Sequence, residues 1–170
     1  EDEKNVIPVF KDILQIYPEL KIMGSPWSAP AWMKTNNSLK GGSLKTSCYQ
    51  VYAMYFVKYI QAMAQLGIPI SAVTPQNEPL HTTASYPCMG MSMSEQASFI
   101  KTALGPVFKD ANIKTKIIIY DHNWDNTDYA ISILNDKDAA SFIAGSAFHA
   151  YAGEVSAMNK VHLAHPQKEL

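Results

Sequence analysis

The most constraining feature of this chain is a repeated alternation between segments with helical spacing of apolar residues and short apolar runs of strand length. The expected helices are residues 2–16, 49–66, 92–110, 127–143 and 154–164, and the expected strands are 21–24, 70–76, 116–120 and 145–149. Helices that alternate with strands imply a parallel sheet covered by helices, in the α/β class. No linker or low-complexity segment interrupts the pattern, so we expect one domain over residues 1–170.

Local signals place the ends of several of these elements. Pro18 stops the first helix, and Gly67 is the expected carboxyl cap of the second. Ser92 and Glu95 form a capping-box pattern that starts the third helix, which Gly105-Pro106 should kink or divide. The series Tyr49, Tyr52, Tyr55, Phe56 and Tyr59 is expected to form the core and rim of the second helix.

Two architectures fit the alternation: an open doubly wound sheet and part of a (β/α)8 barrel. A complete barrel needs around 250 residues and eight strands, whereas this chain has 170 residues and four expected strands. The loops after the strands are long, no dinucleotide or Walker loop is present, and the strand ends carry Trp27, Glu78, Asp121 and His149. We therefore expect a partial TIM barrel of about four central β/α units out of eight.

Glu78 is the strongest catalytic candidate from the residues alone. The apolar strand that contains Ala72 and Val73 runs directly into Asn77-Glu78-Pro79, so a carboxyl group stands where a parallel strand ends, which is where α/β barrels place their catalysts. A carboxylic acid on a rigid strand end is suited to general acid/base catalysis. The alternative is an ordinary solvated loop carboxylate.

Three segments are distinctive together: the paired-tryptophan loop at 25–36 (SPWSAPAWMKTN), the strand end at 73–79 (VTPQNEP) and the strand at 145–151 (GSAFHAY). In combination they resemble glycoside hydrolase family 30, which includes lysosomal glucosylceramidases and bacterial and fungal β-1,6-glucanases. The resemblance covers essentially the whole chain in the same order. It implies that residues 1–170 are an incomplete glycoside hydrolase catalytic (β/α)8 domain.

The resemblance also implies roles for individual residues. Glu78 matches the acid/base, and Asn77 matches the asparagine that contacts the sugar 2-hydroxyl. Trp27 matches the tryptophan that borders the sugar before the scissile bond. Three more residues match positions that line the same substrate pocket: Tyr151, His149 and Asp121.

The family that the chain resembles retains anomeric configuration, which requires a second carboxylate about 5 Å from the first. We expect this nucleophile beyond the end of the chain, because Glu169 would lie at the entrance of the next strand, on the wrong face of a barrel. These residues alone should then be inactive. The expected substrate is a β-glucoside, β-glucan or glycosphingolipid, and the stretches at 80–81 and 89–91 look closer to β-1,6-glucanases.

A non-enzymatic alternative is an α/β domain that binds carbohydrate or protein through a face with Trp27, Trp32 and Glu78. For Trp32 a packing role beneath the long loop is preferred. Asp121-His122 resembles an acid/base pair, but neighbouring strand residues point to opposite faces, which argues against a dyad. Two alternatives for Asp121 are that it orients a pocket residue and that it caps a loop.

Composition limits the partners. The net charge of -1 suggests no nucleic-acid partner, and no run approaches the roughly 18 to 20 apolar residues of a membrane span.

Cys48 and Cys88 lack zinc-site spacing, and they are either free thiols or a disulfide in an oxidising compartment. We expect no metal, no cofactor and a monomer. Family analogy suggests a secreted, periplasmic or lysosomal location.

Overall fold

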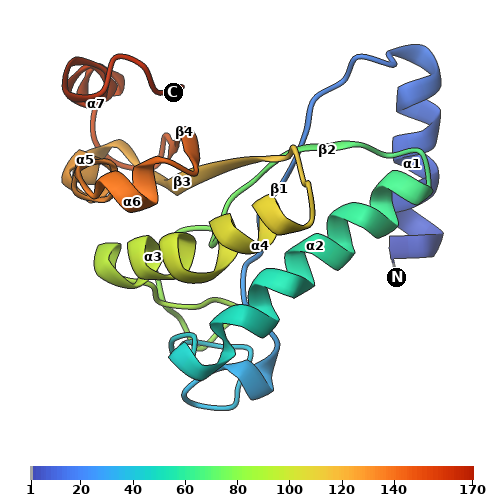
Figure 1. Cartoon of the computed structure of the whole chain (residues 1–170), viewed down its shortest axis with the longest axis horizontal. Helices are drawn as coiled ribbons and strands as arrows, with labels where there is room; N and C mark the ends of the chain where they lie inside the picture. Colours follow the sequence, from blue (N-terminus) through green and yellow to red (C-terminus); the bar gives the residue numbers. More distant parts are fainter. Residues whose placement is uncertain (1) are drawn as a thin grey trace.

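The computed structural model describes residues 2–170 and contains a four-stranded parallel sheet (Figure 1). The strands are β1 (Ile22–Gly24), β2 (Ile70–Val73), β3 (Lys116–Asn123) and β4 (Ile143–His149). Their order in the sheet is β1-β2-β3-β4, which is also their order along the chain. The predicted parallel α/β sheet is therefore confirmed.

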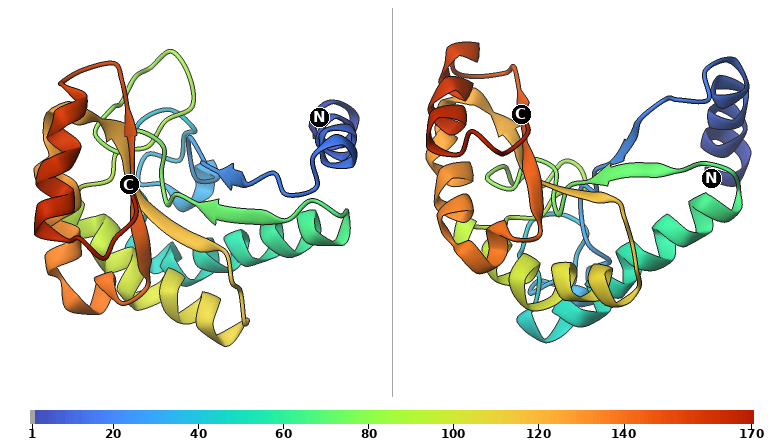
Figure 2. Two further views of the ribbon diagram at one scale, coloured as in Figure 1. Left: turned by 90° about the horizontal axis from the view of Figure 1, so that it is seen from above. Right: turned by 45° about the horizontal axis from the view of Figure 1, so that its top comes forward.

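This strand order separates the two expected architectures. Right-handed crossovers that always advance in one direction place all helices on the same face of the sheet, whereas a doubly wound sheet needs a point where the order reverses. Figure 2 shows the helices in an arc around the outside of a curved sheet, with α1 (Asp2–Ile16) at one end and α7 (Met158–Ala164) at the other. The arrangement is that of part of a barrel.

The remaining helices follow the expected ranges with two divisions. They are α2 (Tyr49–Gln65), α3 (Met93–Phe99), α4 (Gly105–Asp110), α5 (Thr127–Asn135) and α6 (Lys137–Ala140). A π-helical turn, η3 (Ile100–Leu104), separates α3 from α4, directly before Gly105-Pro106. A Cβ atom on Gly105 would lie 2.2 Å from the Phe142 ring, so only glycine allows this close approach.

The capping box at the start of α3 is confirmed. The Ser92 hydroxyl accepts a hydrogen bond from the Glu95 amide, and the Glu95 side chain accepts one from the Ser92 amide. Two amides that the helix leaves unpaired are thereby satisfied, which fixes where α3 begins after the long loop.

The core lies between the convex face of the sheet and α2, η3 and α5. Aromatic rings form its centre, where the Tyr52 and Phe99 ring centres are 5.6 Å apart and those of Tyr49 and Phe99 are 5.3 Å apart. In the predicted aromatic series of α2, Tyr49, Tyr52 and Phe56 are buried, whereas Tyr55 is exposed. The series therefore contributes both to the core and to the rim of α2, as predicted.

The concave face of the sheet carries an exposed apolar residue. Residues 21–24 contain a short apolar run that was expected to form a strand, and within it Met23 is 47% exposed. Side chains alternate along a strand, so Met23 points to the face that no helix of the described residues covers. The strand expected to reach Gln76 ends at Val73, because Pro75 has no amide to continue the ladder.

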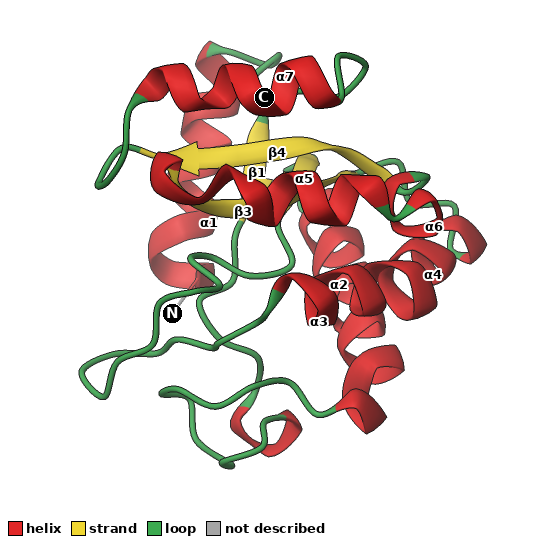
Figure 3. Ribbon diagram, turned by 90° about the vertical axis from the view of Figure 1, so that its left-hand side faces the viewer, coloured by secondary structure: helices red, strands yellow, loops and turns green. Residues whose placement is uncertain are grey.

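The long loops gather at the end of the sheet toward which the strands point (Figure 3). They are the segments 25–48 after β1 and 74–92 after β2. Cys48 and Cys88 lie at the ends of these loop regions, and both are buried, free thiols. The disulfide alternative is therefore not realised in this structure.

Candidate active site

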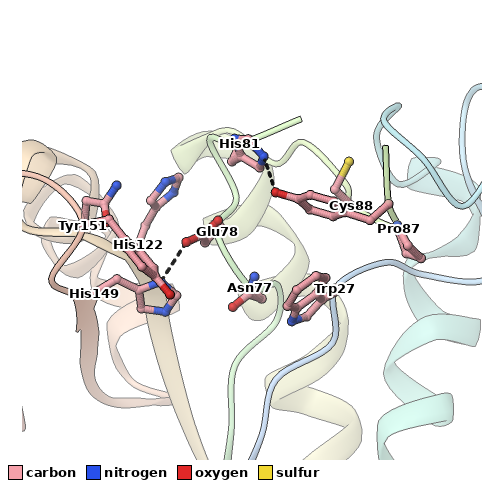
Figure 4. Close-up of a pocket in the computed structure, with 11 residues that line it drawn as sticks. Trp27, Asn77, Glu78, His81, Pro87, Cys88, His122, His149 and Tyr151 are labelled. Atoms are coloured by element: carbon pink, nitrogen blue, oxygen red, sulfur yellow. Dashed lines mark hydrogen bonds and ion pairs between the residues drawn. The ribbon is translucent and has the colours of Figure 1, made fainter. Parts of the chain in front are cut away.

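A cavity of about 410 Å³ opens at the carboxyl ends of the strands, within the range of small-ligand pockets (Figure 4). Its walls come from the loops after β1, β2 and β4 and from the end of β3. The lining residues are Trp27, Asn77, Glu78, His81, Tyr86, Pro87, Cys88, His122, Asn123, His149 and Tyr151. Of the predicted site residues, five line this cavity and Asp121 does not.

Glu78 lies on the floor of this cavity, five residues after β2 ends. Its backbone amide donates to the carbonyl oxygen of Asp121 at 2.9 Å, which ties the chain after β2 to the end of β3. Its φ of 45° is in the left-handed region, where residues other than glycine are strained. The carboxyl group is thus held at a fixed point, with 20% of the side chain exposed.

A bulge in β3 provides the carbonyl that receives the Glu78 amide. Tyr120 and Asp121 have φ values of 71° and 56°, and the pairing with β4 shifts register between Tyr120 and His122. The fully buried Gln96 side chain of α3 accepts a hydrogen bond from the Tyr120 amide at 3.1 Å. Gln96 therefore satisfies an amide at the bulge, and the strained backbone becomes tolerable.

His149, the last residue of β4, connects two carboxyl groups. Its Nδ1 lies 2.9 Å from Glu78 Oε1, and its Nε2 lies 2.9 Å from Asp121 Oδ1. Burial lowers the pKa of this imidazole, but the hydrogen bonds to Glu78 and Asp121 raise it, and the net effect is a raised pKa. Glu78 after β2, Asp121 of β3 and His149 of β4 thus form one hydrogen-bonded chain.

Asp121 lies beneath the cavity rather than on its surface. The residue is only 3% exposed, and its Oδ2 accepts hydrogen bonds from the Thr74 hydroxyl at 2.9 Å and from the Ser25 hydroxyl. Both carboxyl oxygens are therefore occupied by protein donors. Asp121 does not line the cavity itself, because the bulge turns its side chain toward His149, and this contact fits the alternative in which Asp121 orients a pocket residue.

His122 lines the cavity, and the pattern of alternating strand residues did not select it. The Leu80 amide donates to His122 Nδ1 at 3.3 Å, so this nitrogen is an acceptor. Burial lowers the pKa of His122, which favours the neutral ring. The partner of Asp121 is His149 and not His122, in agreement with the argument against an Asp121-His122 dyad.

Aromatic residues form the opposite wall of the cavity. Trp27 and Tyr86 have ring centres 5.4 Å apart, and His81 Nε2 lies 2.9 Å from the Tyr86 hydroxyl. The Gln76 side chain donates to the carbonyl oxygens of Trp27 and Asn77, each at 2.8 Å. These contacts fix the loop after β1 against the loop after β2.

Lys34 holds this wall together from inside. Its side chain is fully buried, and Nζ donates to Ser28 Oγ at 2.8 Å, to the Leu39 carbonyl at 2.9 Å and to the Cys88 carbonyl at 2.7 Å. Burial lowers the pKa of this ammonium group. All three ammonium hydrogens have acceptors, which offsets the cost of burying the charge without a carboxylate.

Trp32 and Tyr151 are both exposed. Trp32 was expected to pack beneath the loop, but its side chain is 59% exposed, because Met33 and Ala29 fill the interior of the loop instead. Tyr151 is 84% exposed and stands at the rim of the cavity, with its ring centre 5.9 Å from that of His149.

The loop residues His81, Tyr86, Pro87 and Cys88 were not selected from the sequence as site residues, although they line the cavity. In the sequence, these four residues could have been recognised by their position: they follow Glu78 in a long loop that contains aromatic residues. Position alone could not show that the loop folds back onto Trp27.

Glu169 lies at the other end of the sheet, as expected. It pairs with Gly145 near the start of β4 and forms an ion pair with Lys116 at the start of β3. It is therefore distant from the cavity at the carboxyl ends of the strands.

Within residues 2–170, no group of three or more His, Cys, Asp and Glu side chains is arranged to hold a metal ion. In the same range, no helix has both the length and the apolar character needed to cross a membrane.

Comparison with known proteins identifies relatives along the whole chain. An endo-1,6-β-D-glucanase of Neurospora crassa is 37% identical over 164 residues, which cover 93% of this chain and 34% of that protein. The lysosomal acid glucosylceramidase of mouse is 34% identical, over 89% of this chain and 31% of that protein. The solved structure of an endo-β1,6-glucanase superimposes with a TM-score of 0.95 at 41% identity, covering 99% of this chain and 40% of that one.

The chain spans about a third of the length of the curated relatives it matches. The model of the glycosyl hydrolase family 30 TIM-barrel domain matches residues 1–170. This match agrees with the parallel sheet in sequential strand order and with the helices on its convex side. The chain therefore belongs to glycosyl hydrolase family 30 and forms part of its TIM-barrel domain.

Proposed function

We propose that the protein containing this chain is a retaining β-glycosidase in which Glu78 is the general acid/base. The observation that carries the proposal is the position of the Glu78 carboxyl group, fixed on the floor of a polar and aromatic cavity at the carboxyl end of a barrel strand. Glu78 donates a proton to the leaving glycosidic oxygen, and it later removes a proton from the water that releases the sugar.

The surroundings of Glu78 support a sugar as the ligand. Trp27 offers an exposed aromatic face on one wall, and aromatic faces bind the apolar faces of sugar rings. Asn77 precedes Glu78 and also lines the cavity, where its amide reaches a sugar hydroxyl. The 2-hydroxyl is the expected partner, because a hydrogen bond there strengthens in the oxocarbenium-like transition state.

Double displacement needs a second carboxylate about 5 Å from Glu78 as the nucleophile. Among the described residues Glu78 is the carboxyl group that lines the cavity, and Asp121 is engaged beneath it. We place the nucleophile in a part of the protein outside these 170 residues. The greater length of the relatives leaves room for it.

The proposed substrate is a β-1,6-linked glucan, with a β-glucosyl lipid as the second candidate. The glucanase relatives are 37% to 41% identical, whereas the mouse glucosylceramidase is 34% identical. The relative named lysosomal also supports a location outside the cytosol, as does the resemblance noted above.

The test is a Glu78→Gln substitution in the full-length protein, with Glu169→Gln as the matched control. We expect Glu78→Gln to lower turnover of a β-1,6-glucan by about 10²- to 10⁴-fold, the usual contribution of a general acid/base. Glu169→Gln should leave turnover unchanged, because Glu169 lies at the opposite end of the sheet. Full turnover in Glu78→Gln would overturn the assignment. Tight glucan binding without turnover in the unmodified protein would favour the non-enzymatic binding domain.

A further inference from the structure

His149 uses both of its ring nitrogens within the protein. Nδ1 lies 2.9 Å from Glu78 Oε1 and Nε2 lies 2.9 Å from Asp121 Oδ1, so a sugar hydroxyl would have to displace one of these contacts. The side chain is also largely covered, with 22% of it exposed. His149 is therefore better placed to influence the protonation of Glu78 than to contact the substrate.

The number of protons in this chain of groups is informative. An ionised carboxylate has no hydrogen to donate, and a neutral imidazole has one N–H. Two hydrogen bonds between His149 and the two carboxyl groups therefore require one additional proton. Asp121 also receives the Ser25 and Thr74 hydroxyls, which suits it to remain an acceptor. The additional proton then lies between Glu78 and Nδ1.

We propose that Glu78 and His149 share one proton, and that Asp121 holds the imidazole in the orientation that allows this sharing. His149 and Asp121 are then positioning residues, and the inference rests on the proposed acid/base role of Glu78. In one form Glu78 is a carboxylate and His149 an imidazolium. In the other, Glu78 is a carboxylic acid that donates to neutral Nδ1. Moving one proton converts the first form into the second without changing the total charge.

The shared proton fits both halves of the proposed reaction. When the bond from the anomeric carbon to the leaving oxygen breaks, that carbon bonds to the nucleophile carboxylate, and the leaving oxygen keeps the bonding electrons and takes the proton from Glu78. The pair then has one proton fewer. It regains a proton when water bonds to the anomeric carbon and gives one hydrogen to Glu78, while the bond to the nucleophile breaks and its electrons return to that carboxylate, so the cycle ends as it began.

The neighbouring groups favour retention of this proton. The titratable side chains that face His149 among the described residues are Glu78 after β2, Asp121 and His122 on β3, and Tyr151 after β4. His122 has a pKa lowered by burial, and its ring centre is 6.4 Å from that of His149, so it faces His149 as a neutral ring. With two carboxyl groups in contact, the pKa of His149 is raised despite burial. The imidazole should therefore keep its proton to a higher pH than a histidine exposed to water.

The first test compares pH profiles of kcat/KM for the full-length enzyme and its His149→Gln and Asp121→Asn variants, with a β-1,6-linked glucose disaccharide as substrate. We expect both variants to move the basic limb to lower pH by about one unit or more and to lower kcat at least about tenfold, with KM changed by less than about twofold. A raised KM with an unchanged basic limb would show that His149 is a sugar contact and would overturn the proposal.

A second test needs no substitution. In the unmodified enzyme, the Glu78 carboxyl carbon and the His149 ring nitrogens are labelled and followed by NMR as the pH rises. A shared proton predicts that both signals change with the same midpoint, because the titration belongs to the pair. Two separate midpoints would overturn the shared proton alone, whereas full turnover in Glu78→Gln would remove the proposed function itself.

Discussion

The two walls of the cavity are built in different ways. One wall consists of strand ends, where Glu78 after β2 and His149 of β4 line the cavity and are joined by hydrogen bonds to each other and to Asp121 of β3 beneath them. The other consists of loops, where Trp27 and Tyr86 present aromatic faces to the cavity. The strand-end wall has left-handed backbone at Glu78 and Asp121, whereas the loop wall is held from inside by a buried ammonium group.

This difference suggests that the two walls have different roles, proton transfer for the strand-end wall and sugar binding for the loop wall. Proton transfer requires positions fixed within a fraction of an ångström, and paired strands provide such positions. Sugar binding needs area and shape, which loops that carry aromatic residues provide. Changes in the strand-end wall should therefore mainly lower kcat, and changes in the loop wall should mainly raise KM. The following substitutions, all in the full-length enzyme, test that division.

Lys34→Met should have the largest effect on stability. It leaves the Cys88 carbonyl and the Ser28 hydroxyl oxygen without the ammonium donor, whereas the Leu39 carbonyl keeps the Cys88 amide as a donor. Buried groups without partners cost about 1–3 kcal/mol each, so the free energy of unfolding should fall by about 3 kcal/mol. Urea unfolding measures this loss, and KM should rise because the loop wall loosens. Lys45→Met is the control, since Lys45 lies in the same loop with partners at the surface. Equal stability of the two variants would contradict the role of Lys34.

Gln96→Leu should come next, and it acts on the strand-end wall. It removes the acceptor of the buried Tyr120 amide, at a cost of about 2 kcal/mol. The bulge that positions Asp121 should relax, so kcat should fall while KM changes little. The control is Gln50→Leu, because the exposed Gln50 side chain donates to a carbonyl on the helical surface. A rise in KM without a fall in kcat would break the proposed division.

Trp27→Ala should raise KM about tenfold, equivalent to about 1.4 kcal/mol of binding free energy, and should change kcat little. Trp32→Ala is a close control. Its side chain is 59% exposed, compared with 52% for Trp27, but it does not line the cavity. If both substitutions raise KM equally, the sugar-binding surface extends beyond the cavity, and Trp27 contributes no more to sugar binding than Trp32 does.

Ser92→Ala should give the smallest effect. Loss of the cap of α3 should lower the free energy of unfolding by about 1 kcal/mol. Neither kcat nor KM should change, because the cap belongs to the scaffold between the walls. Ser94→Ala, two residues further along the chain in the same helix, should lower stability less. Thermal unfolding together with steady-state kinetics would reveal any effect on either wall.

The elements of the fold were predictable because their signals are local. The spacing of apolar residues, Pro18, Gly67 and the Ser92–Glu95 pattern are all readable from neighbouring positions, and α1, α2 and α3 begin or end within one residue of the expectation. The exposure of Met23 was not predictable in the same way, because it depends on what covers the concave face of the sheet and not on the neighbouring residues in the sequence.

The positions of Glu78 and His149 in the cavity were predictable, because each follows from its place at or after the end of a strand. The burial of Asp121 and the place of His122 in the cavity were not predictable, because both follow from a bulge whose amide is satisfied by Gln96, 24 positions earlier. Alternation along a strand assumes regular pairing, and one shift of register invalidates it. The exposure of Trp32 likewise depends on which side chains fill the loop.

The hydrogen bond from the Glu78 amide to the Asp121 carbonyl has a consequence for dynamics. His149 is 71 positions from Glu78 along the chain, so the site has no local segment that could form or open by itself. The Glu78 amide can exchange its hydrogen with solvent only when the contact between the chain after β2 and the end of β3 separates. Glu78 therefore stays in place for as long as the chain after β2 remains in contact with the end of β3. It moves with the strands rather than with the loops around it.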